Sequence, residues 1–298
     1  MNILVTGSGG FVGKLLCKEF QRRKHSVRTF DIVDGNDIAD FAAVKRAVKG
    51  IHVVYHLAAV LDESSGQLCR VNVDGTRNLL EASAKQHVQQ FIFLSTVGVM
   101  GNIRGEANEK TAYNPETSYE RSKAAAEKLV VDYQEMLPVT IVRSALVLGP
   151  NEYWREIVNL VAKGFPLIGN GKNHWQTIYV KDLVSALLFV LGKQQCIAET
   201  FIAAGKEKPT LRELYAAIQH ELGIENDVKT MSKLLGILLV HAFVLKSRLL
   251  GTKTVVTQVH LKRLLRERNY STKKITALGW QPKYGFQKAL HETVVSLK

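Results

Sequence analysis

Short apolar runs alternate with longer segments of helical periodicity over the first 200 residues of the chain. Apolar side chains recur every three or four residues in the longer segments, which predicts amphipathic helices, whereas the short runs have the length of buried strands. Strands are predicted at residues 3–6, 27–30, 52–56, 91–95 and 139–142, and helices at 12–24, 41–48, 72–86 and 119–135. A strand at 177–180 and a helix at 183–191 are expected to return to the same sheet. This alternation predicts an α/β fold of the Rossmann type, a doubly wound parallel sheet with helices on both faces.

A glycine-rich turn follows the first predicted strand directly. The spacing of Gly7, Gly10 and Gly13 allows a tight turn, a close approach of the backbone to a pyrophosphate, and close packing of the following helix. Asp31 ends the next strand, 18 residues after Gly13, where a carboxylate can bind the ribose hydroxyls of an adenosine. Because a carboxylate repels a 2′-phosphate, we expect NAD rather than NADP. The alternative is that Asp31 only begins the turn at 31–37.

The strand and helix pattern loosens after Gly149 and Pro150. A segment rich in glycine and proline at 164–171 interrupts it, and from Thr210 onward the pattern is mostly helical. We therefore expect two units. Residues 1–148 and 174–204 would form a dinucleotide-binding Rossmann domain, and residues 149–173 and 205–298 a smaller, mostly helical substrate-binding lobe.

The composition is typical of a globular protein, with 46% hydrophobic and 22% charged residues. Cys17, Cys69 and Cys196 are odd in number and widely spaced, so neither a disulfide framework nor a metal site is expected. The first predicted strand begins at residue 3, which leaves no room for a signal peptide. Together these features predict a cytoplasmic protein.

The positive charge is concentrated near the end of the chain. Residues 229–298 contain 14 Lys and Arg against only Glu267 and Glu292, which gives +12 of the total net charge of +13. Such a region either binds an anionic partner or forms a solvated charged surface, and the sequence does not distinguish these two interpretations. Nucleic acid is not expected, because no recognition motif is present and the basic residues lack interleaved aromatic side chains.

The same region contains twelve consecutive residues without a formal charge, at 234–245. A membrane-spanning helix needs about 20 apolar residues, so this segment is too short to cross a bilayer. The preferred interpretation is a buried helix over a substrate pocket. The alternative is a helix that lies on an acidic membrane surface, with Lys246, Arg248 and Lys253 facing the lipid headgroups.

Several segments in this order resemble the extended short-chain dehydrogenase/reductase superfamily, which contains NAD-dependent epimerases, dehydratases and 3β-hydroxysteroid dehydrogenase-like enzymes. The resemblance covers roughly residues 1–205, and its segments are TGSGGFVG at 6–13, Asp37-Ile38, HLAA at 56–59, NVDGT at 72–76, FIFLSTVGVMG at 91–101 and YERSK at 119–123. It implies that NAD is bound by Gly7, Gly10, Phe11, Val12, Gly13, Asp31, Asp37, Ile38, Leu57, Ala58, Ala59, Tyr119 and Lys123.

The Tyr-x-x-x-Lys motif of that superfamily occurs three times, as Tyr119/Lys123, Tyr270/Lys274 and Tyr284/Lys288. Only the first pair follows the fourth predicted strand within a helical pattern, where positions i and i+4 share a face. We expect Tyr119 to take a proton from a substrate hydroxyl, with an ammonium nearby and the positive nicotinamide favouring the phenolate. The resemblance implies that Lys123 lowers the pKa of Tyr119 and holds the nicotinamide ribose. It also implies that Thr96, with Ser95 as the alternative, donates a hydrogen bond to the substrate oxygen.

The substrate is less clearly indicated. Trp175 stands where nucleotide-sugar members of the superfamily commonly carry a phosphate-binding Arg. With the apolar segment at 234–245, this favours a dehydrogenase that acts on a hydrophobic or lipid-like secondary alcohol or ketone. A nucleotide-sugar epimerase or dehydratase is the alternative, supported by Tyr179, Val180 and Asp182. A non-catalytic NAD-binding sensor protein is the second alternative, and the superfamily suggests a homodimer.

Overall fold

The computed structural model describes residues 1–250 and 258–297, and its centre is a sheet of six parallel strands. The strands lie in the order β2-β1-β3-β4-β5-β9, and every neighbouring pair is parallel. Their bounds are β1 (Asn2–Thr6), β2 (Ser26–Phe30), β3 (Val53–His56), β4 (Gln90–Thr96), β5 (Val139–Ser144) and β9 (Glu199–Ala203). The order reverses beside β1, so ligands are expected in the crevice at the carboxyl ends of the strands. The predicted Rossmann-type fold is confirmed.

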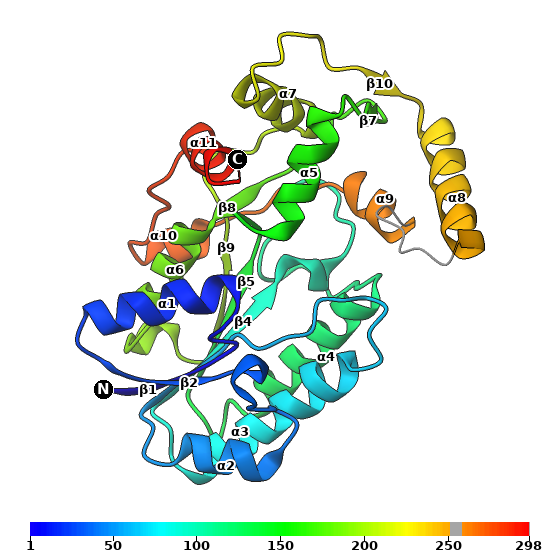
Figure 1. The fold of residues 1–298 in the computed structure, drawn as a ribbon. Helices are drawn as coiled ribbons and strands as arrows, with labels where there is room; N and C mark the ends of the chain where they lie inside the picture. Colours follow the sequence, from blue (N-terminus) through cyan, green and yellow to red (C-terminus); the bar gives the residue numbers. More distant parts are fainter. Residues whose placement is uncertain (251–257, 298) are drawn as a thin grey trace.

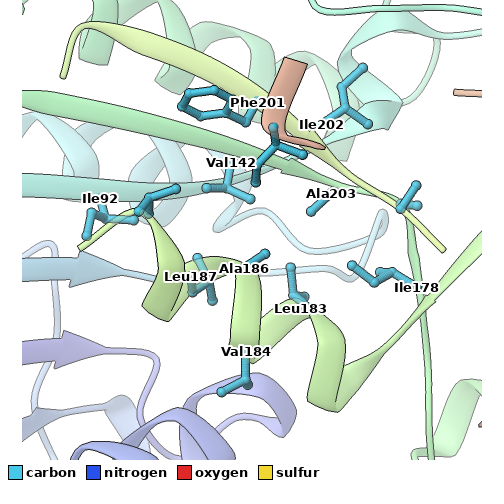
Figure 2. Packing of buried hydrophobic residues seen from close by; sticks show 14 of the residues in the cluster. Ile92, Val142, Ile178, Leu183, Val184, Ala186, Leu187, Phe201, Ile202 and Ala203 are labelled. Carbon is cyan, nitrogen blue, oxygen red and sulfur yellow. The ribbon is translucent and has the colours of Figure 1, made fainter. Parts of the chain in front are cut away.

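Helices cover both faces of this sheet (Figure 1). On one face lie α1 (Phe11–Arg22) and α6 (Val180–Phe189), and on the other α2 (Phe41–Val48), α3 (Gly75–Lys85) and α4 (Ser118–Asp132). Figure 2 shows side chains of α6, among them Leu183 and Leu187, lying between α6 and the sheet residues Ile92, Val142 and Phe201. All five side chains are fully buried, which explains why these strands are almost uniformly apolar.

The sixth strand of the sheet differs from the expectation. The segment predicted at 177–180 forms β8 (Thr177–Tyr179), but β8 pairs with β6 (Leu146–Leu148) in a separate two-stranded sheet. The position beside β5 is taken by β9 instead. The sequence of β9, ETFIA, begins with two polar residues that are only half-buried, so the strand shows a weak apolar pattern.

The rest of the chain forms a second group of elements. It contains α5 (Glu152–Ala162), β7 (Leu167–Ile168), α7 (Leu211–Glu221), β10 (Thr230–Met231), α8 (Lys233–Leu250), α9 (Gln258–Leu264) and α11 (Phe286–Val295). The remaining helix, α10 (Lys273–Ala277), packs against β9 of the main sheet instead. In Figure 1, α5, α7, α8 and α9 gather at the end of the molecule opposite to α2 and α3. Trp154 and Trp175 are almost fully buried in the core of this group.

The apolar segment at 234–245 begins α8, and its described part is not a buried helix over a pocket. Leu234, Leu235 and Leu238 are 69%, 51% and 58% exposed. The preferred interpretation of this segment is therefore wrong for that part. No helix within the described residues is long and apolar enough to span a membrane. Lys253 and the side chains of Lys246 and Arg248 lie outside the described residues.

Candidate active site

A cavity of about 1130 Å³ lies at the carboxyl ends of the strands. Every residue predicted to bind the cofactor or take part in catalysis lines it, from the glycine turn to Asp31, Thr96, Tyr119 and Lys123. The remaining predicted residues that line it are Phe11, Val12, Asp37, Ile38, Leu57, Ala58, Ala59 and Ser95. The fold thus brings the predicted residues together.

The glycine turn between β1 and α1 leaves no room for side chains at its two ends. Gly7 has a φ of +70°, and a Cβ atom added there would lie 2.6 Å from the backbone nitrogen of Ala58. A Cβ atom at Gly13 would lie 2.1 Å from the carbonyl oxygen of Gly7. Glycine is therefore required at both positions, and the exposed amides at the start of α1 fit the pyrophosphate of a dinucleotide.

Asp31 holds the glycine turn against the end of β2. Its carboxylate accepts hydrogen bonds from the backbone N–H groups of Gly9 (2.8 Å) and Val33 (3.1 Å). The turn-forming alternative is thus part of its role, but Asp31 also faces the cavity. Ile32 and Val33 line the same part of the cavity and are 68% and 74% exposed. Exposed apolar side chains can pack against an adenine ring, and the carboxylate beside them can bind the hydroxyl groups of its ribose.

Asp37 and Ile38 close the same end of the cavity. The Asp37 carboxylate accepts hydrogen bonds from the N–H of Ala39 (2.9 Å) and from Arg70 (2.5 Å), and together they hold its pKa below the ordinary value. Ile38 is buried, and its side chain packs against Gly75 at the start of α3. Asp37 is therefore charged and fixed in position before any ligand arrives.

Tyr119 and Lys123 lie in the first two turns of α4, which begins with a capping box between Thr117 and Glu120. Burial raises the pKa of Tyr119 to about 12, and Arg263 is the cation that acts against this shift. Burial also lowers the pKa of Lys123 to about 7. The expectation that Lys123 lowers the pKa of Tyr119 is not met, because desolvation dominates both groups and the cation that acts on Tyr119 is Arg263.

The Lys123 ammonium has its own partners. It donates a hydrogen bond to the carbonyl oxygen of Leu94 (2.8 Å) and lies 4.0 Å from the centre of the Phe93 ring. Both partners belong to β4, so the lysine is held against the strand that carries Thr96.

Thr96 and Ser95 differ in whether their hydroxyl group is available. Thr96 Oγ1 accepts a hydrogen bond from the N–H of Gly98 (3.1 Å), which fixes the side chain and leaves its hydroxyl proton free to be donated into the cavity. The hydroxyl of Ser95 donates instead to the buried carboxylate of Glu127. The geometry favours Thr96 as the donor.

His56 has a structural role. It is buried between the hydroxyl groups of Thr6 and Thr76, each 2.8 Å away. Burial lowers its pKa well below the ordinary value, so the ring is neutral. It therefore ties β1, β3 and α3 together beneath the glycine turn.

Asn72 is a residue whose role the sequence did not reveal. Its side chain bonds both backbone groups of Val60 (2.7 and 3.0 Å) and donates to Ser122 Oγ (2.9 Å). Ser122 in turn donates to the carbonyl oxygen of Tyr119 (2.7 Å). This buried amide connects the loop after β3 to the helix of Tyr119.

Charged residues of the C-terminal region line the opposite side of the cavity, and the sequence showed them only as part of a net charge. Arg263 donates to Glu63 (2.5 Å), whose other carboxylate oxygen accepts the N–H of Tyr119 (3.0 Å). Arg266 forms ion pairs with Glu116 (2.5 Å) and Glu120 (2.6 Å). The C-terminal region is thereby attached to the start of α4, directly beside Tyr119.

Arg268 is the arginine of this group without a carboxylate partner among the described residues. Its guanidinium carbon lies 4.4 Å from the centre of the Trp175 ring, and one Nη donates to the carbonyl oxygen of Arg263 (3.1 Å). Its buried Nε has no hydrogen-bond partner within the described part of the chain. Trp175 therefore supports an arginine at the cavity wall.

The two other Tyr-x-x-x-Lys pairs do not form a second site. Tyr270 lines the cavity, but Lys274 points away from it and pairs with Glu199 (2.5 Å). Tyr284 and Lys288 contact each other, and neither lines the cavity. Only Tyr119 and Lys123 face the cavity together.

The parallel sheet, the glycine turn and the Tyr119–Lys123 helix around one cavity define an enzyme of the extended short-chain dehydrogenase/reductase type. The model of the NAD dependent epimerase/dehydratase family matches residues 3–202. The chain therefore belongs to this family, which confirms the expected enzyme class and its NAD cofactor.

Three relatives illustrate the likeness. An N-acetyl-alpha-D-glucosaminyl-diphospho-ditrans,octacis-undecaprenol 4-epimerase of Escherichia coli O157:H7 is 27% identical over 314 residues, covering 98% of this chain and 94% of the relative. An uncharacterized UDP-glucose epimerase of Bacillus subtilis is 28% identical over 277 residues, covering 79% and 87%. The structure of UDP-glucuronic acid 4-epimerase from Bacillus cereus with UDP-glucuronic acid and NAD has a TM-score of 0.79 at 21% identity, covering 100% and 99%.

Proposed function

We propose that this enzyme oxidises a secondary hydroxyl group of a sugar carried on a diphosphate to a ketone and then returns the hydride to the sugar. An epimerase returns it to the same carbon, and a dehydratase returns it to another carbon after water has been lost. The observation that carries the proposal is one cavity in which a dinucleotide turn, a Tyr–Lys helix and an arginine available for an anion meet. The names of the relatives support this substrate class over the hydrophobic alcohol that the sequence alone favoured.

The cofactor end of the cavity would be formed by the predicted residues. The amides around Gly10, Phe11, Val12 and Gly13 would bind the pyrophosphate. Asp31 would bind the adenosine ribose, and Asp37 with Ile38 would contact the adenine. Leu57, Ala58 and Ala59 would lie along the middle of the dinucleotide.

Bound NAD supplies a hydride acceptor, and the chain supplies the proton transfers and the orientation. Tyr119 Oη would remove the proton of the sugar hydroxyl while Thr96 Oγ1 donates a hydrogen bond to the same oxygen. Lys123, whose ammonium is held near Thr96 by Leu94, would bind the nicotinamide ribose. A positive nicotinamide and a bound ribose would each favour the phenolate that burial alone disfavours.

The diphosphate of the substrate would bind at Arg268. A guanidinium stacked on a buried tryptophan keeps its planar set of donors fixed, which suits bidentate contact with phosphate oxygens. Arg263 and Arg266 are already neutralised by glutamates, so they are better placed to hold the helix of Tyr119 than to bind substrate.

The test is a product assay with NAD and a panel of UDP-glucose, UDP-glucuronic acid, dTDP-glucose and simple secondary alcohols. Sugar products are identified by NMR, and nicotinamide reduction is followed by absorbance. An isomerised or dehydrated sugar diphosphate without net NADH supports the proposal. Net formation of NADH with secondary alcohols alone would show that the protein is a dehydrogenase instead. Binding of NAD without any product would support the non-catalytic NAD-binding sensor protein.

The expected homodimer and a contact of the basic C-terminal region with a membrane are further parts of the proposal. The membrane contact rests on the exposed apolar surface of α8.

A further inference from the structure

The outer face of α8, formed by Leu234, Leu235, Ile237 and Leu238, is an exposed apolar surface. These four large side chains are 39% to 69% exposed and fall within five consecutive positions. At 100° per residue they occupy one side of the helix. A strip of this kind on one helix marks a binding surface rather than scattered apolar exposure.

The opposite side of α8 attaches the helix to the protein. Gly236 is buried against Ile168 of β7, and a Cβ atom added at Gly236 would lie 2.5 Å from Ile168 Cγ2. Val240 packs in a small cluster with Ile168 and Leu261 of α9. Because this inner side already holds α8 in place, the outer face is not needed for the helix to pack.

The segment that contains α8 carries charges of one sign in its own sequence, although Arg263 and Arg266 pair with glutamates from elsewhere in the chain. Residues 228–266 contain no Asp or Glu, whereas their basic residues are Lys229, Lys233, Lys246, Arg248, Lys253, Lys262, Arg263 and Arg266. Among those with described side chains, Lys229, Lys233 and Lys262 are exposed. An apolar strip flanked by lysines matches a partner that is anionic at its surface and apolar just beneath it, which is the chemistry of an acidic phospholipid bilayer.

The inner side of α8 connects the helix to the substrate side of the cavity. Leu261 of α9 packs against α8, and Arg263, two residues further along, lines the cavity. Figure 1 shows α8 and α9 side by side at one edge of the molecule. A membrane on the outer face of α8 would therefore be separated from the substrate side of the cavity by α8 and α9.

We propose that the outer face of α8 docks on the surface of an anionic phospholipid bilayer. The docking itself is independent of the reaction. Its consequence, access of the site to a sugar diphosphate carried on a lipid, rests on the proposed function.

The test is cosedimentation of the full-length protein with phosphatidylglycerol/phosphatidylcholine vesicles and with phosphatidylcholine vesicles. The parent protein should bind the anionic vesicles at low salt, release them at high salt and bind the neutral vesicles weakly. Leu235→Gln/Leu238→Gln should reduce the partition coefficient at least about tenfold, since each buried leucine contributes about that factor. The matched control Val131→Gln/Met136→Gln replaces exposed apolar residues near the end of α4 and should bind like the parent.

Three results would overturn the proposal. One is no binding of the parent to anionic vesicles at low salt, and another is unchanged binding of Leu235→Gln/Leu238→Gln. The third is light scattering that shows a parent dimer dissociating in that variant, with vesicle binding absent, which would make the face an interface between two copies of the chain. Tyr119→Phe should bind vesicles like the parent, so docking and turnover can fail separately.

Discussion

The two sides of the cavity bind by different physical means. On the cofactor side, backbone amides and the glycine turn provide shape, and the carboxylates of Asp31 and Asp37 are held by backbone N–H groups. On the substrate side, side-chain charges dominate, with Arg263 and Arg266 paired to glutamates and Arg268 left for an anion. Variants on one side should therefore act through steric fit, and variants on the other through charge.

The start of α4 lies between these two sides, so Tyr119 is placed to contact both the cofactor and the substrate. Tyr119→Phe removes the proton-transfer group and should lower kcat about 10²- to 10⁴-fold. NAD affinity should stay within a factor of about two, because no cofactor-side packing changes. Steady-state kinetics and NAD titration on the same preparation measure both values. A variant with normal turnover would exclude Tyr119 as the general base.

On the substrate side, Arg268→Gln removes a cation that no carboxylate neutralises in the described residues. We expect KM for the sugar diphosphate to rise about 10- to 100-fold, the effect of losing one charge-assisted hydrogen bond, while NAD affinity is unchanged. Arg22→Gln is the matched control, because this arginine is exposed on α1 and pairs with Glu19 away from the cavity. Equal KM values in the parent and in Arg268→Gln would show that the diphosphate of the substrate does not bind at Arg268.

On the cofactor side, Gly13→Ala should show the reverse pattern. The new Cβ atom would meet the Gly7 carbonyl oxygen at 2.1 Å, so the turn must shift, and NAD affinity should fall about tenfold or more. KM for the sugar diphosphate, measured at saturating NAD, should change little. If that KM rose as much as the Kd for NAD, the cofactor side and the substrate side of the cavity would not bind their ligands independently. Fluorescence titration of NAD provides the measurement.

The smallest effect concerns the pH dependence of stability at Lys123. Its folded-state pKa of about 7 lies below the ordinary value of 10.5, so between pH 7 and 10 the unfolded chain binds the extra proton. The contribution of Lys123 to stability therefore rises with pH over this range and is lowest below pH 7. The free energy of unfolding of Lys123→Met minus that of the parent should decrease from pH 7 to pH 10, by at most about 1.4 kcal/mol per pH unit. Urea unfolding of both proteins across this pH range measures the difference. A difference that increases with pH would contradict the prediction.

The two sides also differ in how far the sequence predicts them. Each cofactor-side residue follows a strand within a short motif, so Gly7, Asp31 and Ala58 could be placed from local spacing. The pair of Glu63 and Arg263 joins positions 200 residues apart, and nothing near either residue indicates the other. The charge of the C-terminal region was visible, but not which of its arginines would remain unpaired.

The missed strand β9 and the exposed α8 have a similar cause. The ETFIA sequence of β9 has the weak pattern of an edge strand, and the apolar segment of α8 gave no sign of which neighbours would cover it. Burial is decided by packing partners such as Ile168 and Leu261, which are distant in sequence.

The most direct test is rapid mixing of the NAD-loaded enzyme with the sugar diphosphate identified in the product assay. The nicotinamide absorbance should rise and then decay within one turnover in the parent, and it should stay flat in Tyr119→Phe. A rise that never decays, or the same transient in Tyr119→Phe, would contradict the assignment of this cavity and of Tyr119.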